Sequence, residues 1–540
     1  MRPTGYGGWV QGRDAGPTFV NPLEDPLIRR LAAVVIIGSF MSVLDTTIVN
    51  VAIETLSRDF RSPLSTIQWV TTGYLLALAL VIPMSGWVVE RFGSRRMFVL
   101  SLVLFTLGSG LCGFAWSPAS LIAFRFLQGI GGGMLMPIGQ SVLARAAGPQ
   151  RMGRMMSVIG VPTLLAPVLG PVLGGLIVDN LSWRWIFFVN VPIGVLGLGL
   201  SLKWLPGGDR VEASRFDLTG MALLSPGLAA LLYGLSEAGV GSGLADPVVI
   251  GCLGGGALLI AAFVLHARRS ERPLLDVRLF AERGFAAANV ALFLVVGAIY
   301  GAMFLLPLYY QVLRGESALS AGLLMAPQGI GAALMMPIGG RLTDRIGPGR
   351  VVPIGMTVVL IGTVLYTQVG PTTSYAWLAL ALFVRGLGVG WTMMPSSAAA
   401  YAHISHDAVP RATTALNIVI RIGGSFGTAV VALVLQRQID TRLPAASHLL
   451  STGVVSGARH LAPRAAVQLG HAFGAAFWTV LVMTCVGLGA TFLLPRIRPS
   501  GAAAAVGTDG QGQVSTGPGE AVIVPHVVEE SEEKLRTQPL

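Results

Sequence analysis

Charged residues are scarce in this chain of 540 residues: Asp, Glu, Lys and Arg together make up 12%, about half the share found in soluble domains. Apolar residues make up 53%, and 70 glycines come in addition. A chain of this size needs a far more polar surface to stay dissolved. The composition therefore excludes an ordinary soluble protein and indicates an integral membrane protein.

Cysteine and catalytic motifs are also scarce. Cys112, Cys252 and Cys485 each lie in apolar runs without CxxC or Cys/His spacing, which argues against a disulfide framework and a metal site. His403 and His406 have no third ligand nearby, so we expect them to bind no metal. No Walker-type GxxxxGK[ST] and no nucleophile–base constellation occur. We expect neither enzymatic activity, nor ATP-driven transport, nor a cofactor.

Long apolar runs are abundant instead. Fourteen of them are long enough to cross about 30 Å of hydrocarbon as helices. Their approximate limits are 31–53, 66–89, 97–116, 118–144, 155–178, 185–205, 218–240, 246–266, 286–311, 318–340, 351–370, 375–401, 412–436 and 472–495. The sequence therefore predicts an all-α membrane protein with both termini on the same side.

The basic residues are unevenly distributed between the two sides. Connections and termini on one side hold 26 of the 37 Lys and Arg, and those on the other hold 8. Basic residues are retained in the cytoplasm, so both termini are predicted to be cytoplasmic. The net charge of +11 is then an orientation signal and not a nucleic-acid site. The prevalence of Arg, 35 against 2 Lys, together with the Ala and Gly content, indicates a bacterial protein.

The two halves of the chain repeat each other. The set Pro83, Gly86, Glu90, Arg91, Gly93 and Arg96 recurs 254 residues later as Pro337, Gly340, Asp344, Arg345, Gly347 and Arg350. Two parallel repeats of this kind are typical of membrane transporters. Spans 1 to 6 then match spans 9 to 14, and spans 7 and 8 are an insertion.

The repeat predicts the domain organisation. We expect two six-helix bundles, at 31–205 and 286–495, separated by a linker at 206–285 that holds the two inserted helices. The second bundle includes an outside loop at 437–471, part of which is expected to be helical. The segment 1–30 is predicted to be cytoplasmic and is not expected to contain a signal peptide. The tail 496–540 is predicted to be disordered in the cytoplasm.

Six motifs lie in the predicted spans and the connections beside them. They are LDTTIVNVA (Leu44 to Ala52), GWVVERFGSRR (Gly86 to Arg96), FRFLQGIGGG (Phe124 to Gly133), GPVLGG (Gly170 to Gly175), WRWIFFVNVPIG (Trp183 to Gly194) and RIGGSFG (Arg421 to Gly427). Together they resemble the major facilitator superfamily, and within it the fourteen-span drug:proton antiporters of the EmrB/QacA kind. The resemblance extends over about residues 31–495.

The resemblance implies a major facilitator fold with two six-helix bundles, two extra helices and 14 transmembrane helices. It implies proton-coupled export of hydrophobic or cationic drugs or antibiotics across the cytoplasmic membrane by alternating access, driven by the proton gradient. Export of an endogenous lipid or natural product is an alternative, as is a membrane sensor or scaffold that does not transport. The expected partners are a small amphipathic substrate, protons and the lipid bilayer, and the chain is expected to be a monomer that binds no nucleic acid.

Charged residues inside the predicted spans are the first functional candidates, because charges in hydrocarbon are costly unless paired or hydrated. Asp45 in span 1 and Arg125 in span 4 lie about 9 Å and about 10 Å from the outer edge. Their similar depth permits a pair, and we expect Asp45 to carry the coupling proton while Arg125 adjusts its affinity for that proton. A permanent structural pair is the alternative. Arg385 in span 12 is roughly the repeat equivalent of Arg125, displaced by six residues. Arg385 and Arg421 are both interpreted as structural.

Two further groups of residues are predicted to move or seal the bundles. By resemblance, Gly170, Pro171, Gly174 and Gly175 form the antiporter motif of span 5, where small residues permit close helix packing and the contact between bundles seals the cavity on one side. Ordinary small-residue packing is the alternative. A cytoplasmic gate, made when the cavity faces outward, is predicted at Gly86, Glu90, Arg91, Gly93, Arg96, Asp344 and Arg345.

Polar and aromatic residues within the spans are candidates for the substrate cavity. They are Gln68, Trp69, Tyr74, Gln128, Gln140, Asn190, Tyr309, Gln328 and Arg421. For each one a packing or lipid-facing role is an equal alternative, because Trp and Tyr also mark membrane interfaces.

Overall fold

The computed structural model describes residues 26–147, 152–207, 216–240, 244–270, 273–401, 404, 408–443 and 463–494. In these ranges nearly every residue is helical and no β-strand occurs. Thirteen of the described helices are long and apolar enough to cross a membrane, judged by length and composition. The remaining predicted span, 155–178, lies within a further helix of 29 residues, α7. The predicted all-α membrane fold is confirmed.

The first half of the chain forms the helices α1 to α9. Their bounds are α1 Pro26–Ile48, η1 Val49–Ala52, α2 Ile53–Asp59, α3 Leu64–Val81, η2 Ile82–Met84, α4 Ser85–Phe92, α5 Ser94–Gly113, α6 Pro118–Ala147, α7 Met152–Asn180, α8 Trp185–Phe188 and α9 Asn190–Trp204. The second predicted span is broken at Pro83, which has no N–H to continue the helix, so α3 passes through the short 3-10 segment η2 into α4.

The inserted helices and the second half follow. Their bounds are α10 Leu218–Val240, α11 Pro247–Arg269, η4 Val277–Ala281, α12 Arg283–Leu308, η5 Tyr309–Leu313, α13 Ala318–Ile346, α14 Pro348–Val364, η6 Leu365–Gln368, α15 Tyr375–Tyr401, α16 Val409–Arg442 and α18 Pro463–Thr491. The predicted outside loop 437–471 is shorter than expected, because α16 continues to Arg442 and α18 already begins at Pro463.

The repeat is visible in the backbone. Gly93 ends α4 with φ 84°, and Gly347 ends α13 with φ 85°, a region that side chains disfavour and glycine tolerates. Both glycines join two long helices without a loop. We call the end of the helix bundle at Gly93 and Gly347 the motif end. At the opposite end Arg61 and Gly315, again 254 residues apart, also have positive φ, 49° and 67°.

The contact of α5 with α6 recurs between α14 and α15, with a small change in register. A Cβ placed on Gly108 would lie 2.8 Å from Cβ of Gln128, and a Cβ placed on Gly362 would lie 2.8 Å from Cβ of Arg385. Two further contacts correspond in the same way. The contact of Gly129 with Tyr74 corresponds to that of Gly386 with Gln328, and the contact of Gly131 with Phe105 corresponds to that of Gly388 with Val359. Equivalent residues of α6 and α15 are therefore 257 positions apart.

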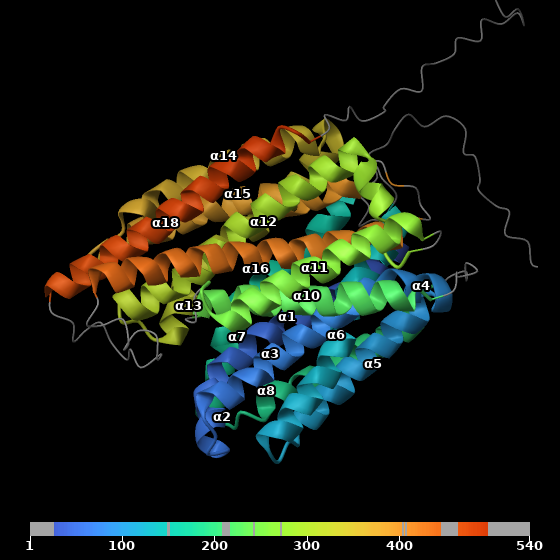
Figure 1. Ribbon diagram of the computed structural model, residues 1–540, viewed down its shortest axis with the longest axis horizontal. Helices are drawn as coiled ribbons and strands as arrows, with labels where there is room; N and C mark the ends of the chain where they lie inside the picture. The colour runs from blue at the N-terminus through green and yellow to red at the C-terminus, as the bar shows by residue number, and fades with distance from the viewer. Residues whose placement is uncertain are drawn as a thin grey trace, which may run out of the picture. The chain divides into compact units, whose positions relative to one another are not determined.

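The two halves meet through a few helices. The helix α7 packs against α1 of its own half and against α13 and α15 of the other. In Figure 1 the helices of the two halves converge at the motif end, near the label α4, and splay apart toward the end at which α2 and α8 lie.

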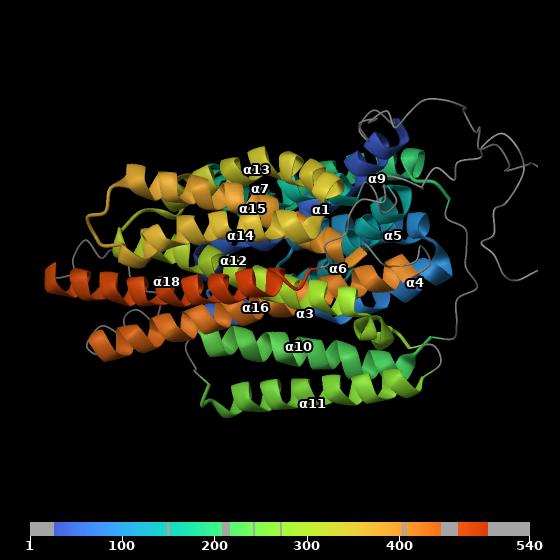
Figure 2. The same cartoon turned by 90° about the horizontal axis from the view of Figure 1, so that it is seen from above.

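The inserted helices form a hairpin on one side of the bundles. The helix α10 packs against α3 and α16, one helix from each half, and α11 lies outside α10 (Figure 2). The hydroxyl of Ser225 on α10 donates to the Leu80 carbonyl at 2.8 Å, close to the break at Pro83. Only 17% of the most apolar 18-residue stretch of α11 is buried, as expected for a helix that packs on α10 and faces lipid on its remaining sides.

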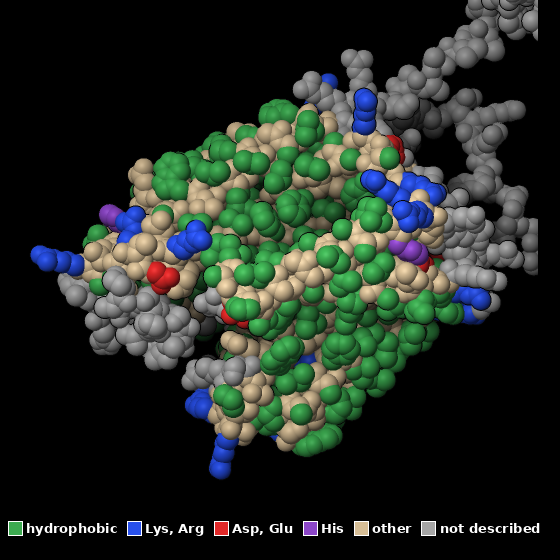
Figure 3. Space-filling model, in the orientation of Figure 1, with side chains coloured by type: hydrophobic (Ala, Val, Ile, Leu, Met, Phe, Trp, Pro, Cys, Tyr) green, Lys and Arg blue, Asp and Glu red, His purple; other side chains and the backbone are tan. Residues whose placement is uncertain are grey.

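The surface is divided into zones. Figure 3 shows Lys and Arg gathered toward the ends of the long helices, with hydrophobic side chains between them. Large exposed apolar residues in this band include Leu107, Leu196, Leu258, Leu334 and Val482. An apolar band of this kind matches the hydrocarbon region of a membrane.

Candidate functional site

The structure brings Asp45 and Arg125 together at the centre of the first half. Asp45 lies on α1 and Arg125 on α6, and both side chains are fully buried. Arg125 Nη1 donates to Asp45 Oδ2. The pair predicted from equal membrane depth is therefore present, and it is shielded from solvent on all sides.

Two amides complete the surroundings of the carboxylate. Gln128 Nε2 donates to Asp45 Oδ1 at 2.9 Å, and Asn190 Nδ2 donates to the same oxygen at 3.2 Å. Gln128 Oε1 also accepts from Arg125 Nη1 at 3.1 Å, and Asn190 Nδ2 also contacts Ser109 Oγ at 3.1 Å. Residues of four helices, α1, α5, α6 and α9, thus form this arrangement, in which three donors surround one buried carboxylate.

The guanidinium of Arg125 is held on two further sides. Its Nε donates to the Val70 carbonyl at 3.2 Å. Its Cζ lies 4.1 Å from the centre of the Tyr74 ring, a cation–π contact. The Tyr74 hydroxyl in turn lies 3.4 Å from Ser42 Oγ on α1. We call Asp45, Arg125, Gln128, Asn190 and Tyr74 the buried polar network.

The glycines of the GIGGG sequence explain why α6 can deliver these side chains. A Cβ on Gly129 would lie 2.7 Å from the Tyr74 carbonyl, and a Cβ on Gly132 would lie 2.7 Å from the Tyr74 hydroxyl. Because no side chain intervenes, α6 approaches α3 closely. Arg125 and Gln128, three residues apart, then share the face of α6 that carries the network.

A second charged contact joins the two halves at the motif end. Arg411 Nε donates to Glu90 Oε1 at 3.0 Å, and its Nη2 donates to Oε2 at 2.9 Å. Glu90 lies on α4 and is buried, while Arg411 lies near the start of α16 and is 27% exposed. This bidentate pair is the strong form of an Arg–carboxylate bond. The predicted gate residue Glu90 therefore pairs with Arg411 from the other half, a partner the sequence did not indicate.

Neutral contacts strengthen the same junction. Ser85 Oγ and Thr414 Oγ1 lie 2.9 Å apart, and a Cβ on Gly86 would lie 3.1 Å from Thr414 Oγ1. Further along α16, Asn417 Nδ2 donates to Gln140 Oε1 of α6 at 2.8 Å.

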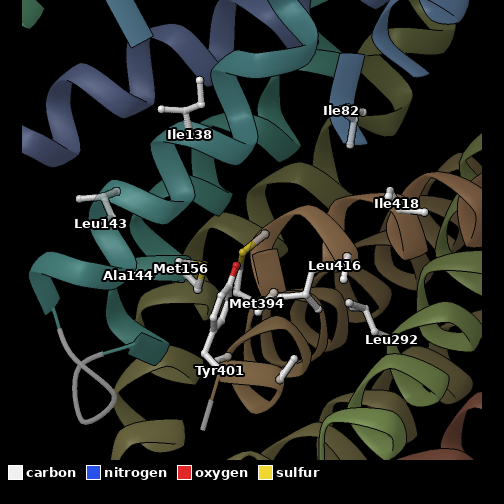
Figure 4. Packing of buried hydrophobic residues seen from close by; sticks show 14 of the residues in the cluster. Ile82, Ile138, Leu143, Ala144, Met156, Leu292, Met394, Tyr401, Leu416 and Ile418 are labelled. Atoms are coloured by element: carbon white, nitrogen blue, oxygen red, sulfur yellow. The ribbon is translucent and has the colours of Figure 1, made fainter. Parts of the chain in front are cut away.

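Apolar side chains from both halves fill the space beside these contacts. Figure 4 shows Met156 of α7 close to Met394 and Tyr401 of α15, with Leu416 of α16 nearby. All four are buried in one hydrophobic cluster. The junction of the halves at the motif end is therefore apolar in part as well as hydrogen-bonded.

The antiporter-motif glycines lie against α1 of the same half. A Cβ on Gly170 would lie 2.1 Å from Thr47 Oγ1, and a Cβ on Gly174 would lie 2.9 Å from the Ile48 carbonyl. Gly175 has nothing within 4 Å of such a Cβ. The close approach between halves occurs elsewhere on α7, at Gly160, where a Cβ would meet Met336 and Met394 at 2.7 Å. The expected contact between halves is thus displaced from the motif itself.

The other predicted gate residues divide into two kinds. Arg91 and Arg96 are exposed at the motif end, as is Arg345, whereas Asp344 is partly buried in the last turn of α13. Their expected contribution to a gate stays a prediction.

The predicted cavity residues lie in several different surroundings, and their role in a substrate cavity stays a prediction. Tyr74, Gln128 and Asn190 belong to the buried polar network, and Gln140 bonds across the halves. Trp69 stacks on Tyr233 of α10 with ring centres 6.0 Å apart. Gln68 is exposed. Tyr309 packs against Phe473 and Phe477 of α18, and its hydroxyl donates to the Gly370 carbonyl at 3.0 Å.

The two remaining intramembrane arginines differ in surroundings. Arg421 is partly buried and lies one turn from Asn417, on the side of α16 that faces α6. Arg385 is buried and its Nη1 donates to Gln328 Oε1 at 2.8 Å. The repeat suggested that Arg385 corresponds roughly to Arg125. The contacts of Gly108 and Gly362 correct this, because they place Arg385 at the position that Gln128 has in the first half.

Several predictions concern residues outside the described ranges. They include His403 and His406, the tail 496–540, most of the N-terminal segment and 444–462 of the connection between α16 and α18. The side chain of Pro171 is likewise outside the description. Within the described residues, no group of three or more His, Cys, Asp or Glu could hold a metal ion.

Comparison with known proteins identifies the family to which this arrangement of helices belongs. The sequence profile of the Major Facilitator Superfamily matches residues 35–428. The chain belongs to this superfamily. The resemblance inferred from the six motifs is confirmed, and the protein is a transporter of a multi-pass membrane family rather than an enzyme.

Two curated relatives and one solved structure illustrate the similarity. The chain is 40% identical over 431 residues to the multidrug resistance protein B homolog of Mycobacterium tuberculosis (strain ATCC 25618 / H37Rv), covering 79% of this chain and 80% of the relative. It is 35% identical over 404 residues to the MFS-type transporter YhcA of Bacillus subtilis (strain 168), covering 75% and 76%. The proton:xylose symporter XylE has the same fold, with a TM-score of 0.56, 15% identity, and 87% and 96% of the two chains covered.

Proposed function

We propose that this protein exports small hydrophobic or cationic amphipathic compounds in exchange for protons, by alternating access between its two halves. The buried carboxylate of Asp45 carries the proposal. It is fully buried, lies within a span, and is held by Arg125 and two amides. Buried ionisable groups in spans are typical of proton pathways. The multidrug resistance name of the mycobacterial relative supports the class of cargo.

Asp45 would exchange its proton through a change in its surroundings. While Arg125 is paired with it, the charged carboxylate is stabilised. A movement of α6 against α1 that separates the two would leave a lone buried carboxylate, which favours its protonated form. Alternation between these arrangements would couple proton uptake on the outside to cargo release there, and proton release on the inside to cargo uptake.

Glu90 and Arg411 would act as the gate of this cycle. We take the motif end as cytoplasmic, with both termini on that side and the chain in a bacterial cytoplasmic membrane. The bidentate pair and the apolar junction beside it close that end, so the described conformation would be outward-facing. A monomer would suffice, with the proton gradient as the energy source and no cofactor.

The test is dye accumulation in a bacterial host that lacks its own multidrug pumps. Cells expressing the wild type should accumulate less ethidium than cells without it, and a protonophore should abolish the difference. Asp45→Asn should remove export at equal membrane abundance. Asp246→Asn, the same chemical change at the N-cap of α11, is the matched control and should export normally. Full protonophore-sensitive export by Asp45→Asn would contradict the proposal.

A further inference from the structure

Arg385 is a buried cation with unused donors. It lies on α15 and is 1% exposed. One nitrogen, Nη1, donates to Gln328 Oε1 at 2.8 Å. Its Nε and Nη2 are buried and have no hydrogen-bond partner within the part of the chain that the structure describes. A buried charge left in this condition is strongly unfavourable unless something else compensates it.

The second half of the chain supplies no carboxylate at this depth. Between residues 283 and 495 the only acidic residues are Glu316, Asp344, Asp407 and Asp440. Glu316 precedes α13 and accepts from the Tyr375 hydroxyl at 2.6 Å. Asp344 and Asp440 lie in the last turns of α13 and α16, and Asp407 lies between α15 and α16. Arg385, at the eleventh residue of α15, is far from all these ends.

The repeat shows what is missing. Arg385 occupies the place that Gln128 has in the first half, and Gln328 occupies the place of Tyr74. Gln128 donates to the Asp45 carboxylate. In the second half the donor is a guanidinium, whereas α12, the counterpart of α1, contains no Asp or Glu. Both halves therefore have a hydrogen-bond donor at this position, Gln128 or Arg385, but only the first half has a carboxylate, that of Asp45, to accept from it.

The unused donors have the geometry of a carboxylate site. In a guanidinium, Nε and Nη2 lie on the same edge and fit the two oxygens of a carboxylate. Arg411 uses these same two atoms to hold Glu90. We propose that Arg385, with Gln328 beside it, binds a carboxylate group carried by a small ligand.

Gln328 places the site on the inner side of α13. The most exposed large apolar side chains of α13 are Leu323, Ile330 and Leu334, which are 52–57% exposed. They lie on roughly the opposite face from Gln328, as 100° per residue requires. The ligand would therefore enter from the helix interior rather than from lipid. If that ligand is cargo, the inference rests on the proposed export and extends its substrates to acidic and zwitterionic amphiphiles.

Binding is tested separately from transport. The thermal unfolding of the purified full chain in detergent is compared in sodium benzoate, sodium chloride and sodium gluconate at equal pH and ionic strength. Benzoate should raise Tm by about 2 °C or more over gluconate. The hydroxyl groups of gluconate make its transfer into an apolar helix interior unfavourable. Arg385→Gln should abolish the shift and Arg385→Lys should remove most of it, because Lys lacks the planar fork. Arg437→Gln, the same change at an exposed arginine of α16, should retain it.

Arg385→Gln should also have a higher Tm than the wild type in gluconate, because it removes an uncompensated buried charge. A lower Tm in gluconate, or no benzoate shift in the wild type, would overturn the proposal. If Arg385→Gln does not fold, Gln328→Leu serves instead and should weaken the benzoate shift. An equal shift with chloride would show that the site holds a free small anion and would overturn the carboxylate assignment.

Transport distinguishes a cargo group from a resident ion. In everted vesicles, Arg385→Gln should reduce transport of the acidic dye fluorescein about tenfold relative to ethidium. Equal loss for both dyes would contradict recognition of a cargo carboxylate by Arg385. Absence of ethidium transport in the wild type would instead count against the proposed export and would leave the Tm result standing.

Discussion

Asp45 and Arg125 form a pair whose members depend on each other, since neither has another charged partner among the described contacts. Removing one member of a buried pair leaves the other charge uncompensated, which costs about 3–5 kcal/mol. Replacing both by apolar residues of similar size is often close to neutral. The two kinds of substitution therefore separate the role of the pair in stability from its role in transport.

We predict that Asp45→Ala and Arg125→Ala each lower the unfolding free energy by about 3–5 kcal/mol, and that the double variant Asp45→Leu/Arg125→Met recovers most of this loss. The measurement is denaturant unfolding in detergent. The double variant should be folded but should not transport ethidium. A double variant that is less stable than both single variants would contradict this account of the pair.

Asp217 lies outside the membrane-spanning part of α10 and fastens the inserted hairpin. Its partial burial alone would raise its pKa, but the N–H groups of Gly220 and Leu274 and the ring of His266 outweigh this effect. The pKa of Asp217 is therefore lowered from its ordinary value of 3.8. His266 Nε2 lies 2.8 Å from Asp217 Oδ1 and links α11 to the start of α10.

A carboxylate whose pKa is lower in the folded state contributes stability above the unfolded pKa and loses it as the pH falls through the folded pKa. We therefore expect the wild type to lose thermal stability as the pH falls below about 4. Asp217→Asn should be less stable than the wild type at pH 7. It should also lack the part of the decrease in Tm on acidification that protonation of Asp217 causes. An identical Tm decrement on acidification in both proteins would argue against the role of Asp217.

Some of these residues were predictable from the sequence and others were not. Asp45 and Arg125 were predictable because a charge within a long apolar run has few uses, and counting residues along each span gave their depths. Arg411 was not, because only the fold brings the start of α16 to α4. Tyr74, Gln128 and Asn190 were recognised as polar residues in spans. Their contacts with the Asp45–Arg125 pair depend on helix rotation, which the composition of a span leaves open.

The helices α4 and α16 meet through Glu90 and Arg411, and this contact is expected to bias the conformation of the whole transporter. Glu90→Arg or Arg411→Glu alone places like charges opposite each other at the motif end. The double reversal, Glu90→Arg with Arg411→Glu, restores an attractive pair at the same position. It is therefore the matched control for both single variants.

We predict that each single reversal increases the reaction of a cysteine placed at Ser85 with a water-soluble maleimide, because the junction opens, and lowers ethidium export about tenfold. The double reversal should return cysteine reactivity toward that of the unreversed protein and restore part of the export. Equal cysteine reactivity in the single and double variants would mean that the pair does not hold the junction closed.

Elements were predicted better than their registers. The apolar runs located nearly every long helix, and Pro83 accounts for the break between α3 and α4. The 254-residue repeat, however, gave the wrong counterpart for Arg385, since α15 is shifted by three residues against α14 relative to the first half. Of the antiporter-motif glycines, Gly170 and Gly174 pack closely against a neighbouring helix, whereas Gly175 does not. Their partner is α1, and no spacing in the sequence distinguishes one neighbouring helix from another.

The molecule as a whole has two charge pairs. Asp45 and Arg125 are buried inside one half, and Glu90 and Arg411 join the two halves at the motif end. In the proposed cycle, movement of the halves would require the Glu90–Arg411 pair to break. The inserted helix α10, which contacts both α3 and α16, would have to accommodate this movement. A proton taken up at Asp45 is the event that we expect to drive the cycle.

The most direct test is the proton flux that accompanies dye transport. Purified protein is reconstituted into liposomes that contain the pH indicator pyranine, and an ethidium gradient is applied without a proton gradient. The wild type should move protons against the dye. Asp45→Asn should bind ethidium but move no protons, while Asp246→Asn should behave as the wild type. Proton movement at the wild-type rate in Asp45→Asn would contradict the account.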